Sequence, residues 1–196
     1  MTGCELIVIG ASSGGLHALG EILAGLPGDF GVPVLIVQHR AEDASDLLAR
    51  LLGRAGPLPV REVEDKEPLT HAGVLIAPCG YHVLVERDHF ALSTEAQVRF
   101  SRPSIDVALE TAADALGPAL IGVVLTGAND DGAAGLAAVR RRGGVAIVQD
   151  PQTATHPTMP AAARAAAYPQ VVAELSEIAP LLARLVAAPP DDGMPT

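Results

Sequence analysis

The sequence contains no tryptophan, and aromatic residues make up only 3% of its 196 residues. Hydrophobic residues nevertheless account for 49%, so there is enough aliphatic material for a large core, and disorder is excluded as the main state. The two cysteines, Cys4 and Cys79, are too few for a disulfide framework or a metal knuckle. We expect one domain of generous size from this length.

Basic residues are also scarce, with 13 Lys and Arg against 23 Asp and Glu and a formal net charge of −10. Nucleic acids and anionic membranes attract proteins of the opposite sign, so no nucleic-acid partner is expected. No apolar run approaches the roughly 18 to 20 residues of a membrane span. The start of the chain, Met1–Leu6, lacks the pattern of a signal peptide. We therefore expect a cytoplasmic protein with no membrane insertion.

Short aliphatic runs alternate with amphipathic stretches rich in Ala and Leu. The runs predict strands at Glu5–Ile9, Pro33–Gln38, Leu58–Val63, Ala119–Thr126, Gly144–Gln149 and Val171–Glu174. Helices are predicted at Gly15–Leu26, Ser45–Leu52, Ile105–Leu116, Gly132–Arg142, Pro160–Ala167 and Ile178–Ala187. This alternation predicts an α/β fold with a doubly wound, mostly parallel sheet, Rossmann-like and three-layered.

Two local features add detail to this fold. Val74–Ala77, Tyr81–Glu86 and His89–Ser93 are separated by turn residues, which predicts an antiparallel meander that contains a hairpin. Ser104 precedes the helix Ile105–Leu116 and has the side chain of a good N-cap.

Polar side chains follow three of the predicted parallel strands. These are the serine pair of Gly10-Ala-Ser-Ser-Gly-Gly15, the histidine of Gln38-His39 and the aspartate pair of Gly127-Ala-Asn-Asp-Asp-Gly132. Ligands of open α/β sheets bind beyond the carboxyl ends of the strands. A serine, a histidine and an aspartate at such an edge are the components of a nucleophile, a base and an orienting carboxylate.

Each of these features also has an ordinary structural interpretation. Gly10-x-Ser12-x-Gly14 has the form of a nucleophile elbow, but it also fits a simple strand-to-helix turn capped by either serine. His39 could be a hydrogen-bonded structural residue, and either aspartate could cap the next helix. Their coincidence at one edge of the sheet favours a Ser-His-Asp triad.

Several segments in the same order resemble the catalytic domain of the CheB chemotaxis methylesterases. They run from about Leu6 to about Leu185 and are Val8-Ile-Gly-Ala-Ser-Ser-Gly-Gly15, Ile36-Val-Gln-His39, Val74-Leu-Ile-Ala-Pro78, Arg102-Pro-Ser-Ile-Asp106, Leu125-Thr-Gly-Ala-Asn-Asp-Asp-Gly-Ala-Ala-Gly135 and Met159-Pro160. The family's domain is a parallel α/β sheet with an antiparallel hairpin, in agreement with the fold expected from the residue pattern.

The resemblance implies a serine hydrolase that cleaves glutamyl methyl esters on chemoreceptors and releases methanol, and many such enzymes also deamidate receptor glutamines. It implies that Ser12 is the nucleophile, His39 the base and Asp131 the residue that orients the base. The backbone N–H of Ser13 is the expected oxyanion donor. No cofactor is expected, and no metal, because the histidines lack a metal-ligand spacing.

The sequence departs from the family where Leu-Thr-Gly-Met-Gly is usual. Ala128 replaces Met and reshapes the expected cleft wall, while Asn129 replaces Gly and tolerates a positive φ better than most residues. Arg40 follows His39 where an apolar residue is common, which predicts a more positive rim. Arg40 and Arg102 are the arginines expected to face an acidic receptor helix.

The predicted organisation is a methylesterase catalytic domain over residues 1–188 and a flexible tail over 189–196. Related proteins usually begin with a receiver domain, and the resemblance here starts almost at Met1, so we expect no receiver domain in cis. The expected partner is a methyl-accepting chemoreceptor or a similar methylated protein.

Other functions fit less well. The glycine-rich turn resembles the cofactor turn of short-chain dehydrogenases, but those need a Tyr with a Lys four residues later, and Lys66, the single lysine, precedes Tyr168 and Tyr81. A P-loop lacks its Gly-Lys-Ser/Thr. A non-catalytic receptor-binding module, and a stand-alone esterase with another protein target, remain the alternatives.

Overall fold

The computed structural model describes residues 3–40, 47–70 and 73–187. Within these ranges the strands are β1 (Leu6–Ala11), β2 (Val34–Gln38), β3 (Val60–Glu62), β4 (Val74–Ile76), β5 (His82–Val85), β6 (Phe90–Ser93), β7 (Leu120–Val124), β8 (Val145–Gln149) and β9 (Val171–Ala173). Seven of them form one parallel sheet in the order β3-β4-β2-β1-β7-β8-β9, and β5 pairs with β6 in a separate antiparallel hairpin.

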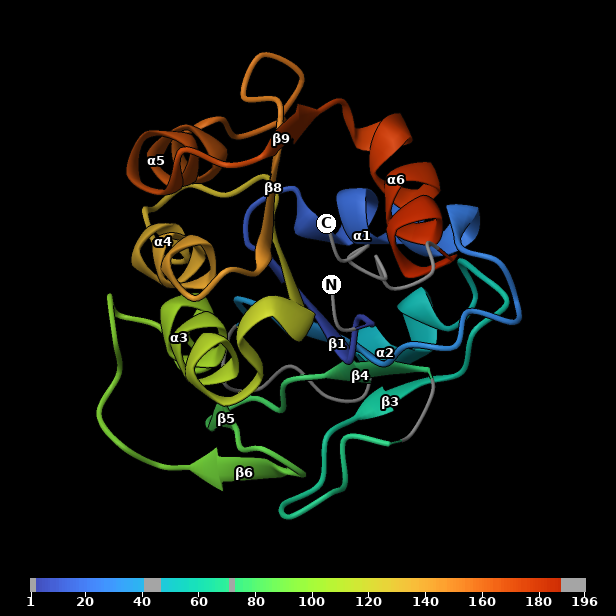
Figure 1. The fold of residues 1–196 in the computed structure, drawn as a ribbon, viewed down its shortest axis with the longest axis vertical. Coiled ribbons are helices and arrows are strands. Elements are labelled where there is room, and N and C mark those ends of the chain that lie inside the picture. Colours follow the sequence, from blue (N-terminus) through green and yellow to red (C-terminus); the bar gives the residue numbers. More distant parts are fainter. Residues whose placement is uncertain (1–2, 41–46, 71–72, 188–196) are drawn as a thin grey trace, which may run out of the picture.

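Helices cover both faces of the large sheet (Figure 1). They are α1 (Gly15–Gly25), α2 (Leu47–Leu52), α3 (Ile105–Leu116), α4 (Ala133–Arg141), α5 (Thr158–Ala167) and α6 (Leu175–Ala187), with a short 3-10 turn at Gly117–Ala119. Helices α3, α4 and α5 lie side by side on one face, while α1, α2 and α6 lie on the other (Figure 1). The expected three-layer α/β fold is therefore confirmed.

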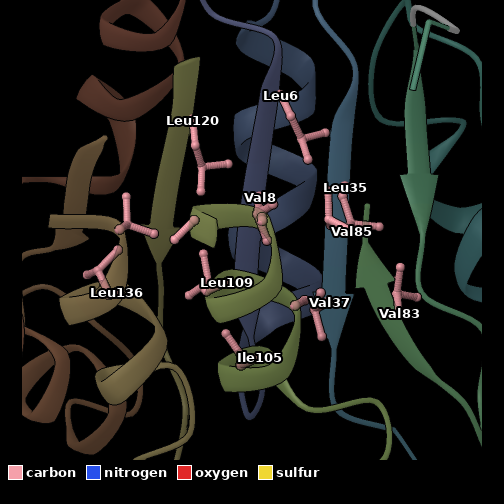
Figure 2. Close-up of a cluster of buried hydrophobic side chains, with 14 of the residues drawn as sticks. Leu6, Val8, Leu35, Val37, Val83, Val85, Ile105, Leu109, Leu120 and Leu136 are labelled. Atoms are coloured by element: carbon pink, nitrogen blue, oxygen red, sulfur yellow. The ribbon is translucent and has the colours of Figure 1, made fainter. Parts of the chain in front are cut away.

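The central strand β1 shows why both faces need cover. Leu6 and Val8 belong to the apolar cluster beneath α3 and α4, whereas Ile7 and Ile9 belong to the cluster beneath α1 and α6. In Figure 2, Ile105 of α3 lies over this first cluster. Side chains alternate across a strand, so a strand that is apolar throughout is buried on both sides.

The order of the strands reverses at β1, which pairs with β2 on one side and with β7 on the other. This reversal is the topological switch point of an open α/β sheet, where loops diverge and leave a crevice. The segments after β1, β2 and β7 are the ones that carry the serine pair, the histidine and the aspartate pair.

One expectation about local structure is wrong. The segment at Val74 is no part of an antiparallel meander: β4 pairs in parallel with β2 and β3, and only β5 and β6 form the hairpin.

Other predictions of local structure are confirmed or lie outside the described residues. Ser104 is the N-cap of α3, and its Oγ accepts a hydrogen bond from the Val107 N–H at 3.4 Å. The tail 189–196 and the start of the helix expected at Ser45–Leu52 lie outside the described residues. Among the helices of the described part of the chain, none has the length and apolar character needed to cross a bilayer.

Candidate active site

Ser12 lies on a tight turn between β1 and α1. Its N–H donates to the Thr126 carbonyl at 3.0 Å, and its own carbonyl accepts from the Gly15 N–H at 2.8 Å. Gly14 is the N-cap of α1 with φ at +80°, a conformation that favours glycine. Neither serine side chain caps α1, so the structural role considered for the serine pair is absent.

Close packing beneath the turn explains why Gly10 has no side chain. A Cβ on Gly10 would lie 2.3 Å from Cγ2 of Ile105, a residue with no exposed surface at the start of α3. This contact lets the N-terminus of α3 approach the end of β1. The aspartate described below binds that same N-terminus.

His39 follows β2 directly and is fixed by its backbone. Its N–H donates to the Ala11 carbonyl at 3.1 Å. The buried side chain of Gln38 donates from Nε2 to the carbonyl of Ser12 at 2.9 Å and to that of His39 at 2.8 Å. One amide group thus ties the serine turn to the residue that bears the imidazole.

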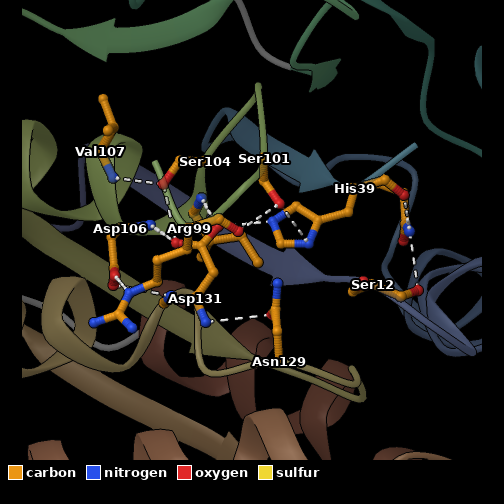
Figure 3. Close-up of polar contacts among 12 residues, drawn as sticks. Ser12, His39, Arg99, Ser101, Ser104, Asp106, Val107, Asn129 and Asp131 are labelled. Carbon is orange, nitrogen blue, oxygen red and sulfur yellow. Dashed lines mark hydrogen bonds and ion pairs between the residues drawn. The ribbon is translucent and has the colours of Figure 1, made fainter. Parts of the chain in front are cut away.

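The imidazole of His39 contacts Asp131 through Nε2, which lies 2.7 Å from Oδ2 (Figure 3). An ionised carboxylate only accepts, so Nε2 carries the proton and Nδ1 of a neutral ring is left as the basic nitrogen. The ring lies between Asp131 and Ser12 in Figure 3. Within the described residues the hydroxyl bonded to Nδ1 is that of Ser101, at 3.5 Å, and not that of Ser12.

Asp131 is fully buried, and four donors converge on its carboxylate. Oδ2 accepts from His39 and from the Ile105 N–H at 2.7 Å, and Oδ1 accepts from the Ser104 hydroxyl and the Asp106 N–H, both at 2.9 Å. Burial opposes ionisation, but the bonds from His39 and the α3 N-terminus outweigh it and lower the pKa of Asp131 below its ordinary 3.8. The carboxylate therefore stays charged beside the imidazole.

Asp106 makes the reciprocal arrangement with the next helix. Its Oδ1 accepts from the N–H groups of Gly132 and Gly135, at 2.9 and 2.8 Å, at the start of α4. Burial, and the charge of nearby Asp131, raise the pKa of Asp106 above its ordinary value. Each aspartate near the start of one helix thus binds the N-terminus of the other helix, where the dipole favours negative charge. The sequence placed Asp106 in the first turn of α3 but gave no sign of this exchange.

A pocket of about 610 Å³ opens beside the imidazole. It is lined by Ser12, His39, Arg40, Gln97, Arg99, Phe100, Ser101, Arg102, Pro103 and Asn129. Asp131 lies behind the histidine, and neither Ser13 nor Ala128 is among the lining residues. The sequence motifs gave no hint of Ser101 or Phe100, because no catalytic pattern includes them.

The two arginines expected at the rim are held by the protein itself. Arg40 forms an ion pair with Glu62 and donates to the Ala77 carbonyl at 3.3 Å, and its side chain is only 7% exposed. Its charge is therefore compensated, so it adds less positive potential than expected. Arg102 donates to the carbonyls of Thr94 and Glu95 at 2.8 and 3.0 Å, and no carboxylate among the described residues pairs with it.

The turn at Ser13 has the features of an oxyanion site. The Ser13 carbonyl accepts from Oγ1 of Thr126 at 2.9 Å, which fixes the peptide. No partner for the Ser13 N–H lies among the described residues, and this N–H lies just before α1. Backbone N–H groups placed in this way stabilise developing negative charge on a carbonyl oxygen.

The loop after β7 differs from the expectation for Asn129. This residue does not take a positive φ; instead its Oδ1 accepts from the Asp131 N–H at 3.3 Å and closes a small turn. Ala128 is exposed on the same loop. The asparagine side chain therefore supports the loop by a hydrogen bond and needs no glycine-like backbone.

Apart from His39, no described histidine lines the pocket. Buried His82 bonds the Ser104 N–H through Nδ1 at 3.2 Å and the Ala96 carbonyl through Nε2 at 3.1 Å. His17 and His89 are near acidic neighbours at the surface, and His71 lies outside the described residues. Across the described ranges, no three His, Cys, Asp or Glu side chains are grouped as metal ligands.

Comparison with known proteins gives one consistent result. The family model described as CheB methylesterase matches residues 7–182. The protein-glutamate methylesterase/protein-glutamine glutaminase 1 of Carboxydothermus hydrogenoformans is 41% identical over 167 residues, which are 82% of this chain and 49% of that protein. A relative from Leptospira interrogans, whose name carries the same two activities, is 45% identical over 182 residues, 92% of this chain and 94% of its own length.

The fold agrees with these relatives. The crystal structure of the Thermotoga maritima CheB methylesterase catalytic domain superposes with a TM-score of 0.89 at 32% sequence identity. The superposition covers 93% of this chain and 99% of that one.

Proposed function

The chain belongs to the CheB methylesterase family, and from that premise we propose that it hydrolyses glutamyl methyl esters of a protein, with Ser12, His39 and Asp131 as its catalytic triad. The observation that carries this proposal is the 2.7 Å contact between His39 Nε2 and Asp131 Oδ2. It leaves Nδ1 as the base on the side of the ring that faces the pocket, and Ser12 lines that pocket.

The acylation step follows from the orientation of the ring. Nδ1 of His39 takes the proton of the Ser12 hydroxyl while Oγ attacks the ester carbonyl carbon. Asp131 stabilises the imidazolium through Nε2, and the Ser13 N–H binds the oxyanion. When the tetrahedral intermediate collapses, the C–O bond to the methoxy group breaks and Nδ1 returns its proton to the departing methanol.

Hydrolysis of the acyl-enzyme repeats these steps with water. Nδ1 takes a proton from the water, whose oxygen attacks the carbonyl carbon, and the proton then goes back to Ser12 Oγ. The product is a glutamate side chain. A glutamine side chain would follow the same route with ammonia as the leaving group, which is the glutaminase activity that the relatives' names carry.

The proposed partner is a methyl-accepting chemoreceptor or a similar methylated protein. Arg102 supports this, because it lines the pocket and no carboxylate among the described residues pairs with it. We propose Arg102 as a contact for an acidic substrate. Arg40, which is paired with Glu62, would act by shaping the wall, and exposed Ala128 would contact the substrate outside the pocket.

Methanol release from a methylated receptor fragment tests the function. Ser12→Ala is expected to lower kcat by about 10³-fold or more, since the nucleophile is lost. Ser176→Ala is the matched control: it removes an exposed serine hydroxyl of α6, which does not line the pocket, so kcat is expected to stay within about threefold of wild type. Equal methanol release by wild type and Ser12→Ala would contradict the proposal.

A different protein target is the second candidate, because Ala128, which replaces the usual methionine, is exposed next to the pocket residue Asn129. The same assay separates the two. Ser12-dependent hydrolysis of a small ester together with no methanol release from methylated receptors would favour the different target.

A further inference from the structure

A strained two-residue turn borders the pocket. Val98 and Ser101 exchange both backbone hydrogen bonds, at 3.1 and 2.9 Å, and the residues between them, Arg99 and Phe100, have φ values of 49° and 61°. Such turns normally contain Asn or Gly, because other side chains destabilise this backbone conformation. A turn made of Arg and Phe persists only if its surroundings hold it.

Ion pairs and a catalytic side chain hold this turn in place. Arg99 donates from Nε to Asp106 at 2.9 Å and from Nη1 to Asp130 at 2.6 Å. The hydroxyl of Ser101 lies 3.5 Å from Nδ1 of His39. The turn is therefore anchored to the same structure that positions the triad.

The side chain that the turn presents is unusual for this protein. Phe100 is 95% exposed, whereas Phe30 and Phe90 are 5% and 0% exposed. Its ring makes no contribution to the buried core, yet Phe100 lines the pocket together with Ser12 and His39. A fully exposed phenyl group at a pocket rim offers a large apolar area to a bound partner.

The length of the substrate side chain brings its backbone to this rim. In a glutamyl methyl ester the carbonyl carbon lies only roughly 4 Å from Cα, by ordinary bond lengths. When that carbon reaches Ser12, the substrate backbone must cross the mouth of the pocket, where residues next to the ester meet Phe100 and Arg102.

We propose that Phe100 is a docking residue for the protein substrate, and that it packs against an apolar side chain beside the methylated glutamate in an acidic segment. This inference rests on the proposed function. The acidic character follows from Arg102, which lines the same pocket and, among the described residues, is bonded only to backbone carbonyls. The anchored turn fixes the backbone that carries the phenyl group, so little backbone freedom is lost on binding.

The test compares two substrates for each variant: a methylated receptor fragment, followed by methanol release, and p-nitrophenyl acetate, which has no flanking residues. Phe100→Gly removes the ring and also relieves the positive φ, so the thermal midpoint is expected to hold or rise. We expect kcat/KM for the methylated fragment to fall about tenfold or more. The value for the small ester is expected to change less than about twofold, since the triad is untouched.

Tyr168→Gly is the matched control. Tyr168 is also an aromatic residue that is largely exposed (79%) and has a positive φ (47°), but it lies at the end of α5 away from the pocket. This variant is expected to leave both substrates unaffected. Phe100→Leu is expected to keep most of the activity on the fragment, because an apolar side chain remains, whereas Phe100→Ser is expected to lose it.

Three results would overturn the inference. An equal loss on both substrates means that the turn serves only to position His39; no loss on the fragment means that Phe100 does not contact the substrate; and a gain means that the ring covers the pocket. Failure of the proposed function is distinguished by Ser12→Ala, which would then match wild type on the fragment whatever stands at position 100.

Discussion

The carboxylate of Asp131 allows a sharp prediction for Asp131→Asn, because each of its two oxygens accepts two hydrogen bonds. An amide has one oxygen and one NH₂ group. If the NH₂ group takes the place of Oδ2, two donors, the Nε2–H of His39 and the Ile105 N–H, point at another donor and lose their acceptor. If it takes the place of Oδ1, only the Asp106 N–H loses its acceptor, because the Ser104 hydroxyl can rotate to accept a hydrogen bond from the NH₂ group.

The second orientation is the less costly, and it sets the magnitude. One buried N–H loses its acceptor, which costs about 1 to 3 kcal/mol. Loss of the charge at the N-terminus of α3 adds about 0.3 to 1 kcal/mol or more. We expect a net loss of about 2 to 4 kcal/mol in the free energy of unfolding, or roughly 5 to 15 °C in Tm. Because the imidazolium is no longer stabilised, kcat is expected to fall by about 10³ to 10⁴.

Urea denaturation and steady-state hydrolysis of p-nitrophenyl acetate measure the two effects. Asp130→Asn is the control, since Asp130 is adjacent but exposed and pairs only at the surface with Arg99. It is expected to change stability by less than about 1 kcal/mol. If Asp131→Asn loses stability but keeps kcat within about tenfold of wild type, Asp131 is a helix cap and not the orienting group of the triad.

Three further predictions concern the same region. Ser104→Ala removes both the cap of α3 and a hydrogen bond to Asp131, so urea denaturation should show a loss of about 2 to 4 kcal/mol; a loss below about 0.5 kcal/mol would contradict the two bonds. Gly10→Ala should cost about 1 to 3 kcal/mol, because its Cβ would lie 2.3 Å from Ile105, and thermal unfolding of the double variant with Ile105→Ala should show less than the sum of the two losses. The lowered pKa of Asp131 means that its stabilising contribution is fully present above its ordinary pKa of 3.8 and is lost as the pH falls below it; urea titrations between about pH 3 and 7 should therefore show a smaller acid-induced loss for Asp131→Asn than for wild type.

The fold was largely predictable because its signals are local. Apolar runs and helical periodicity give most elements to within a few residues, and the parallel sheet follows from their alternation. The exception is β4, whose partners Val34 and Val60 are distant in sequence. A strand of three residues that is followed closely by a hairpin looks like part of a meander, and only tertiary pairing assigns it to the large sheet.

The candidate site was predictable only in part. Motifs at strand ends place Ser12, His39 and Asp131 at one edge, and the structure brings the last two to 2.7 Å. The use of Nε2 for that contact depends on the ring orientation, which no motif encodes. The turn at Arg99 and Phe100 was also not predictable, because neither residue type favours a positive φ.

The exchange of aspartates between α3 and α4 has a consequence for how this chain could lose its activity. Asp131 accepts hydrogen bonds from both the imidazole of His39 and the start of α3, so its loss would weaken the folded protein as well as the proposed chemistry. The Ser12 side chain has no such structural role, because its hydroxyl makes no hydrogen bond among the described residues. A descendant that abandoned hydrolysis but still had to fold would therefore lose the serine first and keep the aspartate as a relic of the reaction.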